Sequence, residues 1–326
     1  TRELSDRGAE LILWPESSYM PLGPIYGKRM DSFAAGVGDD GRIALWRDHQ
    51  DNGFDWSLGP VISKPGVRFR GLAASREDTL FAVGDGGAVV HWNGKEVKRV
   101  PVQTLPDEQA PALFGVAVGT QGGQAAQTDG TPPLVWAVGQ HGHVYTGDAL
   151  GLDLVATNIS TSLRAVTMLP KGRAIAVGDA GVVLALEGRN QTQIKVNTDE
   201  DLLAVVYEAG SRSVWAVGSG GVILSAQGAS WSREASPVKT RLRAITTGQD
   251  GLLFAAGDKG TILRRGLDGV WVQEAIPTKA NIGAITVAPR GEVLASDLVG
   301  SLWKRTQDGS GRWERLDVPG IGPLQA

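Results

Sequence analysis

The sequence predicts an all-β fold, a seven-bladed propeller with about 40 residues in each blade. The first observation behind this prediction is an internal repeat, present in seven copies between residues 33 and 305. The second is the glycine content of 45 in 326 residues, which is about twice the usual share of roughly 7%. Regular glycines between short runs of β-branched residues are typical of many short strands joined by tight turns.

Each copy of the repeat has the pattern strand, glycine turn, strand, and is therefore expected to form a hairpin. Examples are FAVGDGGAVVHW (81–92) and VWAVGSGGVILS (214–225). The second glycines of the seven copies are Gly41, Gly87, Gly142, Gly181, Gly221, Gly260 and Gly300. Their successive spacings are 46, 55, 39, 40, 39 and 40 residues. A unit of about 40 residues is the length of a four-stranded blade.

Two further strands are predicted around each hairpin. An apolar strand precedes the hairpin and is expected to lie innermost in the ring, at 68–75, 112–119, 162–169, 201–208, 241–248 and 281–288. A more polar strand follows the hairpin and is expected at the rim, often opened by tryptophan, as at Trp56, Trp231, Trp271 and Trp313.

The repeat divides the chain into three parts. Residues 1–31 do not fit the repeat and form an atypical N-terminal segment, residues 32–318 form the propeller, and residues 319–326 are a C-terminal tail. Within the propeller, the first copy lacks a clear innermost strand at the usual distance. A Gly/Gln/Thr-rich loop at 119–133 accounts for the 55-residue spacing, and we expect it on the face opposite the glycine turns.

Composition limits the classes of function. Lys plus Arg count 32 against 35 Asp plus Glu, so the formal charge of -3 gives no reason to expect nucleic acid as a partner. No cysteine is present, which excludes disulfides and cysteine nucleophiles. No apolar run approaches the roughly 18 residues that span a bilayer, so we expect no membrane insertion by this chain, while a membrane-associated partner is compatible with it. No motif for a nucleotide or a serine nucleophile occurs, and no cofactor is predicted.

An arginine and an aspartate vary together among the repeats. The arginines Arg70, Arg164 and Arg243 share one place on three innermost strands, and the aspartates Asp85, Asp179 and Asp258 lie 15 residues later in the matching turns. Where the arginine position holds Phe114 or Leu203, the turn holds Gln140 or Ser219; Gly283 with Asp297 is the exception. Because the two positions lie on one face of a blade, each arginine is expected to bond the aspartate of its own blade.

A second interpretation gives the same arginines a binding role. Together with Arg68 and Arg241, they would surround the mouth of the central channel and bind an anionic group of a protein partner. The two interpretations are compatible, because an aspartate can orient a guanidinium whose other edge faces solvent.

Catalytic and metal-binding alternatives have less support. Three arginines on a propeller invite comparison with sialidases, which combine an arginine triad on a six-bladed ring with Tyr, Glu and Asp, and Tyr145 and Tyr207 are available here. Seven repeats are present, however, and the matched aspartates would already occupy the arginines. His141 and His143 are expected on one face of a strand, but no third ligand is nearby in sequence, which favours a solvated turn over a zinc site and predicts no metal.

The W-A-V-G-x-x-G signature, followed by a tryptophan-led strand, resembles the photosystem II stability and assembly factor propellers and the broader BNR/Asp-box group. The resemblance covers residues 32–318. The Asp-box is degenerate here, with Asp51, Gly53 and Trp56 fitting it in the first blade and Thr306, Asp308 and Trp313 in the last. The resemblance implies a non-enzymatic scaffold that docks on partner proteins outside the cytoplasm.

The N-terminal residues TRELSDRGAELILWPESSYMP (1–21) are similar to the helix, strand and W-P-E element of the nitrilase superfamily, in the version found in apolipoprotein N-acyltransferases. The resemblance implies that Glu16 matches the general base of a Glu-Lys-Cys triad. Because the chain has no cysteine, it cannot complete that acyl transfer. The alternative is that residues 11–14 are one more strand and Glu16 is a surface carboxylate.

The sequence leaves three functions open. The preferred one is a protein-binding or assembly scaffold that is not an enzyme. The second is an accessory module of an apolipoprotein N-acyltransferase-like polypeptide, with the catalytic cysteine outside this chain. The third, a glycan-binding or glycosidase propeller, depends on the Asp-box pattern. The start at Thr1 indicates a processed product or an excised fragment, and both resemblances favour a periplasmic or secreted location.

Overall fold

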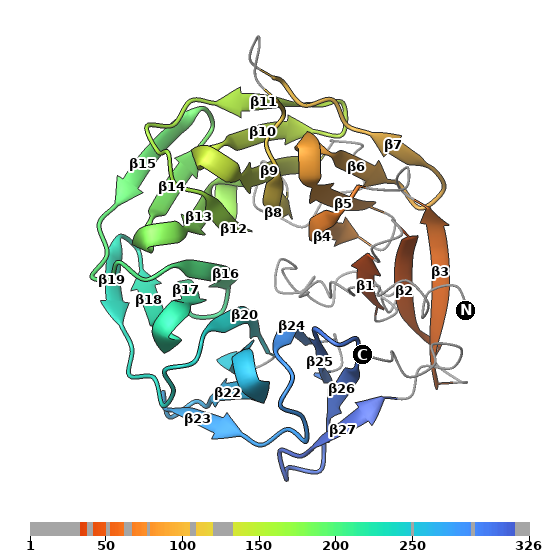
Figure 1. Cartoon of the computed structure of the whole chain (residues 1–326), viewed down its shortest axis with the longest axis vertical. Coiled ribbons are helices and arrows are strands. Elements are labelled where there is room, and N and C mark those ends of the chain that lie inside the picture. The colour runs from red at the N-terminus through yellow and green to blue at the C-terminus, as the bar shows by residue number, and fades with distance from the viewer. Residues whose placement is uncertain are drawn as a thin grey trace.

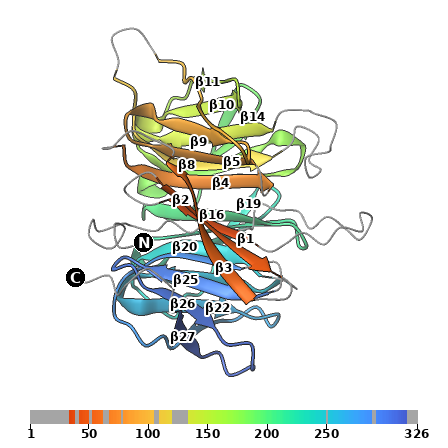
Figure 2. The same cartoon turned by 90° about the vertical axis from the view of Figure 1, so that its right-hand side faces the viewer.

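The computed structural model of the chain is a ring of β-sheets, in which the first strand of each sheet lies nearest the centre and the last lies at the rim (Figure 1). The structure describes residues 67–76, 79–104, 109–119, 133–248, 251–287 and 291–316, together with the backbone of three strands between residues 33 and 61. Seen from the side, the strands run across the thickness of the ring (Figure 2).

Six of the sheets are four-stranded antiparallel blades, and each is formed by consecutive strands of the chain. The first three blades contain β4 (Phe69–Arg76), β5 (Thr79–Gly84), β6 (Val89–Trp92) and β7 (Val97–Arg99); β8 (Leu113–Gly119), β9 (Leu134–Gly139), β10 (Val144–Asp148) and β11 (Gly151–Val155); and β12 (Leu163–Met168), β13 (Ala174–Gly178), β14 (Val183–Glu187) and β15 (Asn190–Ile194).

The other three blades contain β16 (Leu202–Glu208), β17 (Ser213–Gly218), β18 (Ile223–Gln227) and β19 (Ser230–Arg233); β20 (Leu242–Thr247), β21 (Leu253–Gly257), β22 (Thr261–Arg265) and β23 (Trp271–Glu274); and β24 (Ile282–Val287), β25 (Val293–Asp297), β26 (Leu302–Arg305) and β27 (Trp313–Leu316).

The expectation of seven blades is wrong, because the structure has six. The first copy of the repeat forms a three-stranded sheet of β1 (Phe33–Val37), β2 (Arg42–His49) and β3 (Gly53–Val61). Its register matches Phe33 with Arg47 and Trp46 with Trp56, so β1 and β2 are the hairpin and β3 is the rim strand. Within the described residues this sheet has no innermost strand, which is the strand that the sequence also lacks at the usual distance.

The described part of the chain contains no α-helix and hence none that could span a membrane. Its helical turns are short 3-10 turns: η2 (Asp85–Gly87), η3 (Gln140–Gly142), η4 (Pro170–Gly172), η5 (Asp179–Gly181), η6 (Ser219–Gly221) and η8 (Asp258–Gly260). The N-terminal segment with Glu16, the loop residues 120–132 and the tail at 319–326 lie outside the described residues.

Close backbone approaches explain the two glycines of the repeat signature. In the blade β12–β15, a Cβ on Gly178 would lie 2.2 Å from the carbonyl oxygen of Ser162, so this glycine lets the innermost strand lie against the turn. Gly181 has a φ of +68°, and a Cβ there would lie 2.1 Å from the carbonyl oxygen of Thr198, which precedes β16 of the next blade. The second glycine is therefore needed for both its conformation and its lack of a side chain.

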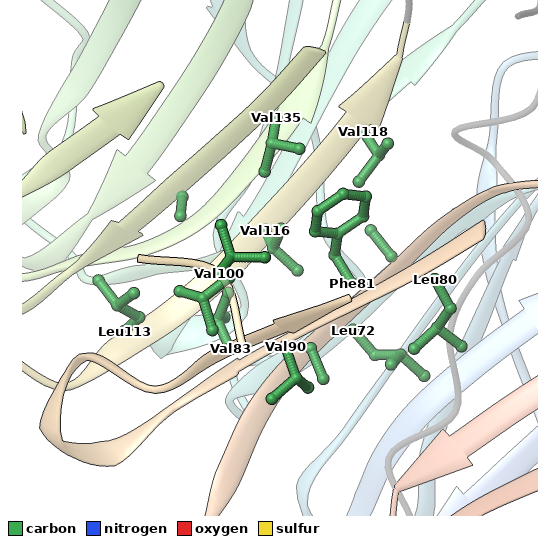
Figure 3. Packing of buried hydrophobic residues seen from close by; sticks show 14 of the residues in the cluster. Leu72, Leu80, Phe81, Val83, Val90, Val100, Leu113, Val116, Val118 and Val135 are labelled. Atoms are coloured by element: carbon green, nitrogen blue, oxygen red, sulfur yellow. The ribbon is translucent and has the colours of Figure 1, made fainter. Parts of the chain in front are cut away.

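The hydrophobic core lies between neighbouring blades. In Figure 3, Leu72 and Phe81 from one blade lie beside Val116 and Val135 from the next, and the four belong to one buried cluster. Phe81 and Val135 are completely buried. Because each blade shares its core with its neighbours, the small and β-branched residues of the repeat face adjacent sheets.

Candidate functional site

A β-bulge occurs at the same place in the innermost strand of every blade. In β12, Leu163 pairs with Gly178 and Ala165 pairs with Val177, so the intervening Arg164 has no partner across the sheet. The six residues at this position are Arg70, Phe114, Arg164, Leu203, Arg243 and Gly283. We call them the bulge positions. A bulge redirects a side chain out of the strand's alternation, and at the three arginine positions the side chain reaches the turn of the same blade.

The structure brings each arginine of the bulge positions onto the aspartate 15 residues later. Arg164 donates from Nε to Oδ1 of Asp179 at 2.6 Å and from Nη2 to Oδ2 at 2.7 Å. Arg70 bonds Asp85 in the same two-bond manner, at 2.5 and 3.3 Å. In the third such blade, Nε of Arg243 donates to Asp258 at 2.5 Å. These pairs lie in alternate blades, β4–β7, β12–β15 and β20–β23.

The paired arginines remain accessible. Their side chains are 38% exposed at Arg70, 37% at Arg164 and 29% at Arg243. The hydrogen bond to Asp179 raises the pKa of the Arg164 guanidinium, which therefore stays charged. Neither bond of Arg164 to Asp179 uses Nη1, so the aspartate fixes one edge of the guanidinium and leaves the other for a further acceptor.

Phe114 connects two of the arginines. Its ring has the Arg70 guanidinium carbon 5.5 Å from its centroid and the Arg164 guanidinium carbon 4.9 Å from it. Both distances lie within the range of cation–π attraction. The stack Arg70–Phe114–Arg164 therefore crosses three consecutive blades. Sequence reasoning missed the role of Phe114, although a single aromatic residue between two arginine-bearing repeats is a visible signal.

Gly283 and Asp297, the exception to the covariation in the sequence, are not equivalent to the arginine–aspartate pairs of the other blades. Asp297 pairs with Ile282 in the register position that glycine holds in the other blades, where Gly257 pairs with Leu242. Its carboxylate accepts from the backbone N–H groups of Val299 and Ser301 and from Nε1 of Trp303. The residue equivalent to the paired aspartates is therefore Leu298, whose N–H donates to the Asn281 carbonyl as that of Asp258 donates to Arg241.

Arg68 and Arg241 lie two residues before a bulge position, on the same face of the ring. Their carbonyl oxygens accept from the backbone N–H groups of Asp85 and Asp258, and both side chains are exposed. We call this face, which carries the turns η2, η3, η5, η6 and η8, the turn face. All five arginines that the sequence singled out are placed there.

His141 lies in a turn and His143 follows it directly, so the turn that the sequence favoured is confirmed, while the placement of both on one face of a strand is wrong. His141 is in η3 with a φ of +53°, and His143 follows that turn. The Nδ1 atom of His143 lies 2.8 Å from the Gln140 carbonyl oxygen, and its ring stacks on the buried Tyr145. Among the residues that the structure describes, no group of three possible metal ligands occurs.

The degenerate Asp-box of the last blade forms a hydrogen-bonded turn. Asp308 accepts from the Thr306 hydroxyl at 2.8 Å and from the backbone N–H of Ser310 at 2.9 Å. Hydrogen bonds from Ser310 are the main cause that holds the pKa of Asp308 well below its usual range. Trp313 is buried at the start of β27. These interactions stabilise a hairpin; the side chains of Asp51 and Trp56 lie outside the described residues.

The blades and their turns define this chain as a β-propeller. No family model matches the sequence, and no curated protein matches it. It is similar in structure to a streptogramin B lyase, with a TM-score of 0.71 and 13% identity over 94% of this chain and 98% of that chain.

A structure titled "YCF48 bound to D1 peptide" has a TM-score of 0.61 and 15% identity, and covers 79% of this chain and 84% of that chain. YCF48 from Cyanidioschyzon merolae has a TM-score of 0.60 and 16% identity, and covers 80% and 89%. YCF48 is a photosystem II assembly factor, and its structural similarity supports the propeller fold that the resemblance implied. The specific resemblance to that factor and the N-terminal resemblance to N-acyltransferases stay predictions. At these identities the likeness shows the fold alone.

Proposed function

We propose that this chain is a protein-binding or assembly scaffold, not an enzyme, and that its turn face binds an acidic segment of a partner protein. The observation that carries this proposal is the Arg70–Phe114–Arg164 stack. It places two partly exposed cations, each oriented by an aspartate, within cation–π distance of one aromatic ring. The structure of YCF48 with a D1 peptide gives a precedent for a peptide held by a propeller.

The chemistry of the turn face suits a carboxylate. A guanidinium held on one edge loses less freedom when it binds an anion on the other edge, and such charge-assisted bonds are the stronger ones. Apolar contact is available as well, because Leu298 and Val299 in the turn of the last blade are 41% and 52% exposed. We therefore expect a segment with at least one acidic side chain next to an apolar one.

The proposal that the chain has no enzymatic activity is supported by where the three arginines lie. A sialidase-like role would require guanidinium groups that converge on one substrate carboxylate, whereas here the arginines lie in alternate blades and each is oriented by the aspartate of its own blade. Tyr145 is buried in β10, away from such a role. The partner's identity, its membrane association and a location outside the cytoplasm stay predictions, as does the accessory-module hypothesis based on Glu16.

Site-specific photocrosslinking tests this function. With benzoylphenylalanine in place of Phe114, ultraviolet light should attach a partner from membrane or soluble extracts to this chain. Benzoylphenylalanine in place of Trp231, on the rim strand β19, is the matched control and should not capture the same partner. Capture at both positions, or at Trp231 alone, would contradict binding at the turn face.

The arginines are tested by changing Arg70, Arg164 and Arg243 together to Gln. Crosslinking at Phe114 should fall at least about tenfold and should weaken with salt, since the binding is electrostatic. Arg189→Gln is the control, because Arg189 bonds Asp153 at 2.5 Å on the outer surface and is 70% exposed. Unchanged capture by a folded triple variant would show that the arginines serve only their own blades.

A further inference from the structure

A carboxylate joins the last two blades at the rim of the ring. Oε2 of Glu274, on β23, accepts from Nε of Arg305 at 2.8 Å and from Nε1 of Trp313 at 3.2 Å. Oε1 accepts from Arg305 Nη2 at 2.8 Å and from Arg264 of its own blade at 3.1 Å. We call this arrangement of one glutamate with the arginine and tryptophan of the next blade a rim clasp. Glu274 is only 9% exposed, and two of the three side chains that donate to it, Arg305 and Trp313, belong to strands of the following sheet.

The preceding interface, between β16–β19 and β20–β23, carries the same three residue types in the same register. Arg265 pairs with Trp271 across β22 and β23, as Arg305 pairs with Trp313 across β26 and β27. The Arg265 guanidinium lies 4.6 Å from the Trp215 ring of the preceding blade, and Arg305 lies 5.8 Å from the equivalent Phe254.

The glutamate of this second interface is Glu234. It comes three residues after Trp231, as Glu274 comes three residues after Trp271. Its Oε1 atom accepts from the hydroxyl of Ser225 in its own blade at 2.5 Å. Ser225 holds the register position of Arg264, so the glutamate makes a contact within its own blade at both interfaces.

The donors of the next blade are left without an acceptor at this second interface. Nε of Arg265 and Nε1 of Trp271 are buried and have no hydrogen-bond partner within the described part of the chain. In the rim clasp of Glu274, the equivalent two atoms converge on a single carboxylate oxygen. A buried donor without a partner is costly, and the cost is greater for a charged group.

The pattern across the other interfaces ties the glutamate to the arginine. Where the arginine position of the next blade holds Gly147, Leu186 or Ala226, the glutamate position holds Val100, Val155 or Ile194, respectively. Among these five interfaces, a glutamate therefore stands in this register position only where the next blade supplies an arginine. A bond to Ser225 alone would not explain why a glutamate at position 234 accompanies Arg265 in the next blade.

We infer that Glu234 has two positions, one on Ser225 and one in which its carboxylate accepts from Arg265 and Trp271 and forms a second rim clasp. Rotation of this side chain moves a negative charge from its own blade to the next. The clasp thus couples the blades β16–β19 and β20–β23 at the rim, a different place from the turn face. This inference does not depend on the proposed function.

The indole N–H resonances of Trp271 and Trp313 in the full chain test this inference, once Trp271→Phe and Trp313→Phe variants assign them. Glu234→Ala should move the Trp271 resonance and speed the exchange of its indole hydrogen by about tenfold, as expected on losing a charged acceptor. Ser225→Ala removes the competing partner and should slow that exchange below the wild-type rate. Glu274→Ala is the positive control and should affect Trp313 in the same way.

The outcomes separate clearly. If Trp313 responds to Glu274→Ala while Trp271 responds to neither Glu234→Ala nor Ser225→Ala, Glu234 does not reach the next blade and the inference is overturned. Should Glu234→Ala fail to fold, Glu234→Gln keeps the shape and removes the charge. That variant should still shift Trp271, and an unchanged resonance would count against the clasp.

Discussion

Leu298 lies directly over Gly283 on the turn face: a Cβ atom at position 283 would be 2.5 Å from Cδ2 of Leu298. The two residues are equivalent to the arginine and the aspartate of the paired blades, and they too are 15 apart. The last blade therefore fills with one apolar side chain the space that an ion pair fills elsewhere. The covariation between the two positions holds in all six blades.

This equivalence can be tested by building a fourth pair. Gly283→Arg alone should destabilise the blade, because the new side chain meets Leu298, and Leu298→Asp alone leaves a carboxylate without an arginine. The double variant should recover about 1 kcal/mol relative to the sum of the single changes, as measured by urea denaturation. Strictly additive effects would show that the two positions are not coupled.

The ion pair of Arg164 with Asp179 should contribute measurably to stability, although solvent screens it. Asp179→Ala is expected to lower the free energy of unfolding by about 0.5–1.5 kcal/mol, because a two-bond pair is stronger than an ordinary surface contact. Asp153→Ala removes the partner of Arg189. That aspartate is 59% exposed, against 26% for Asp179, so its loss should cost close to nothing. Equal effects of the two changes in thermal or urea unfolding would contradict this difference.

Two glycines with similar backbone angles should respond very differently to alanine. Gly181 and Gly188 have φ values of +68° and +58°, but only a Cβ at Gly181 meets a backbone atom, at 2.1 Å. Gly188→Ala should cost about 1 kcal/mol for its conformation. Gly181→Ala should cost at least about 3 kcal/mol, since the neighbouring backbone must also move. Urea denaturation of both variants checks the ranking, and similar losses would exclude the close approach as the reason for this glycine.

The lowered pKa of Asp308 predicts that the stability of the folded chain depends on pH under acidic conditions. Its pKa in the folded chain lies below the unfolded value of about 3.9, because the folded carboxylate accepts hydrogen bonds. Its contribution to stability is therefore fully present above about pH 4 and decreases as the pH falls through the folded pKa. Carboxyl carbon NMR should show Asp308 still ionised where ordinary aspartates are half protonated. The Asp308→Asn variant should lack this part of the acid dependence.

Much of the fold could be predicted because it follows from local rules repeated along the chain. The glycine turns and the apolar strand before them appear in the six blades where the sequence places them, and the polar rim strands lie at Trp231, Trp271 and Trp313 as predicted. The predicted number of seven blades was wrong because counting the repeats counts hairpins, and a hairpin alone does not make a four-stranded blade. A four-stranded blade also needs an innermost strand, which the described part of the first copy does not supply.

The site was predicted where two residues vary together within one blade and missed where a contact crosses between blades. The partner of Arg164 follows from a fixed separation within one blade. The contacts of Phe114, and those of Glu274 with Arg305 and Trp313, join different repeats, so no spacing within one repeat reveals them. The misplaced Asp297 shows the same limit, since only the register shows that the turn of the last blade begins at Leu298.

The contact between Gly181 and Thr198 gives the ring a direction. Thr198 belongs to the stretch of chain that leads into β16, so the glycine turn of one blade supports the start of the next blade. A substitution that disrupts this contact should therefore destabilise the following blade more than the preceding one. In the Gly181→Ala variant, amide exchange should accelerate more in β16 than in β8, which makes the order of the blades along the chain a property of the assembled ring.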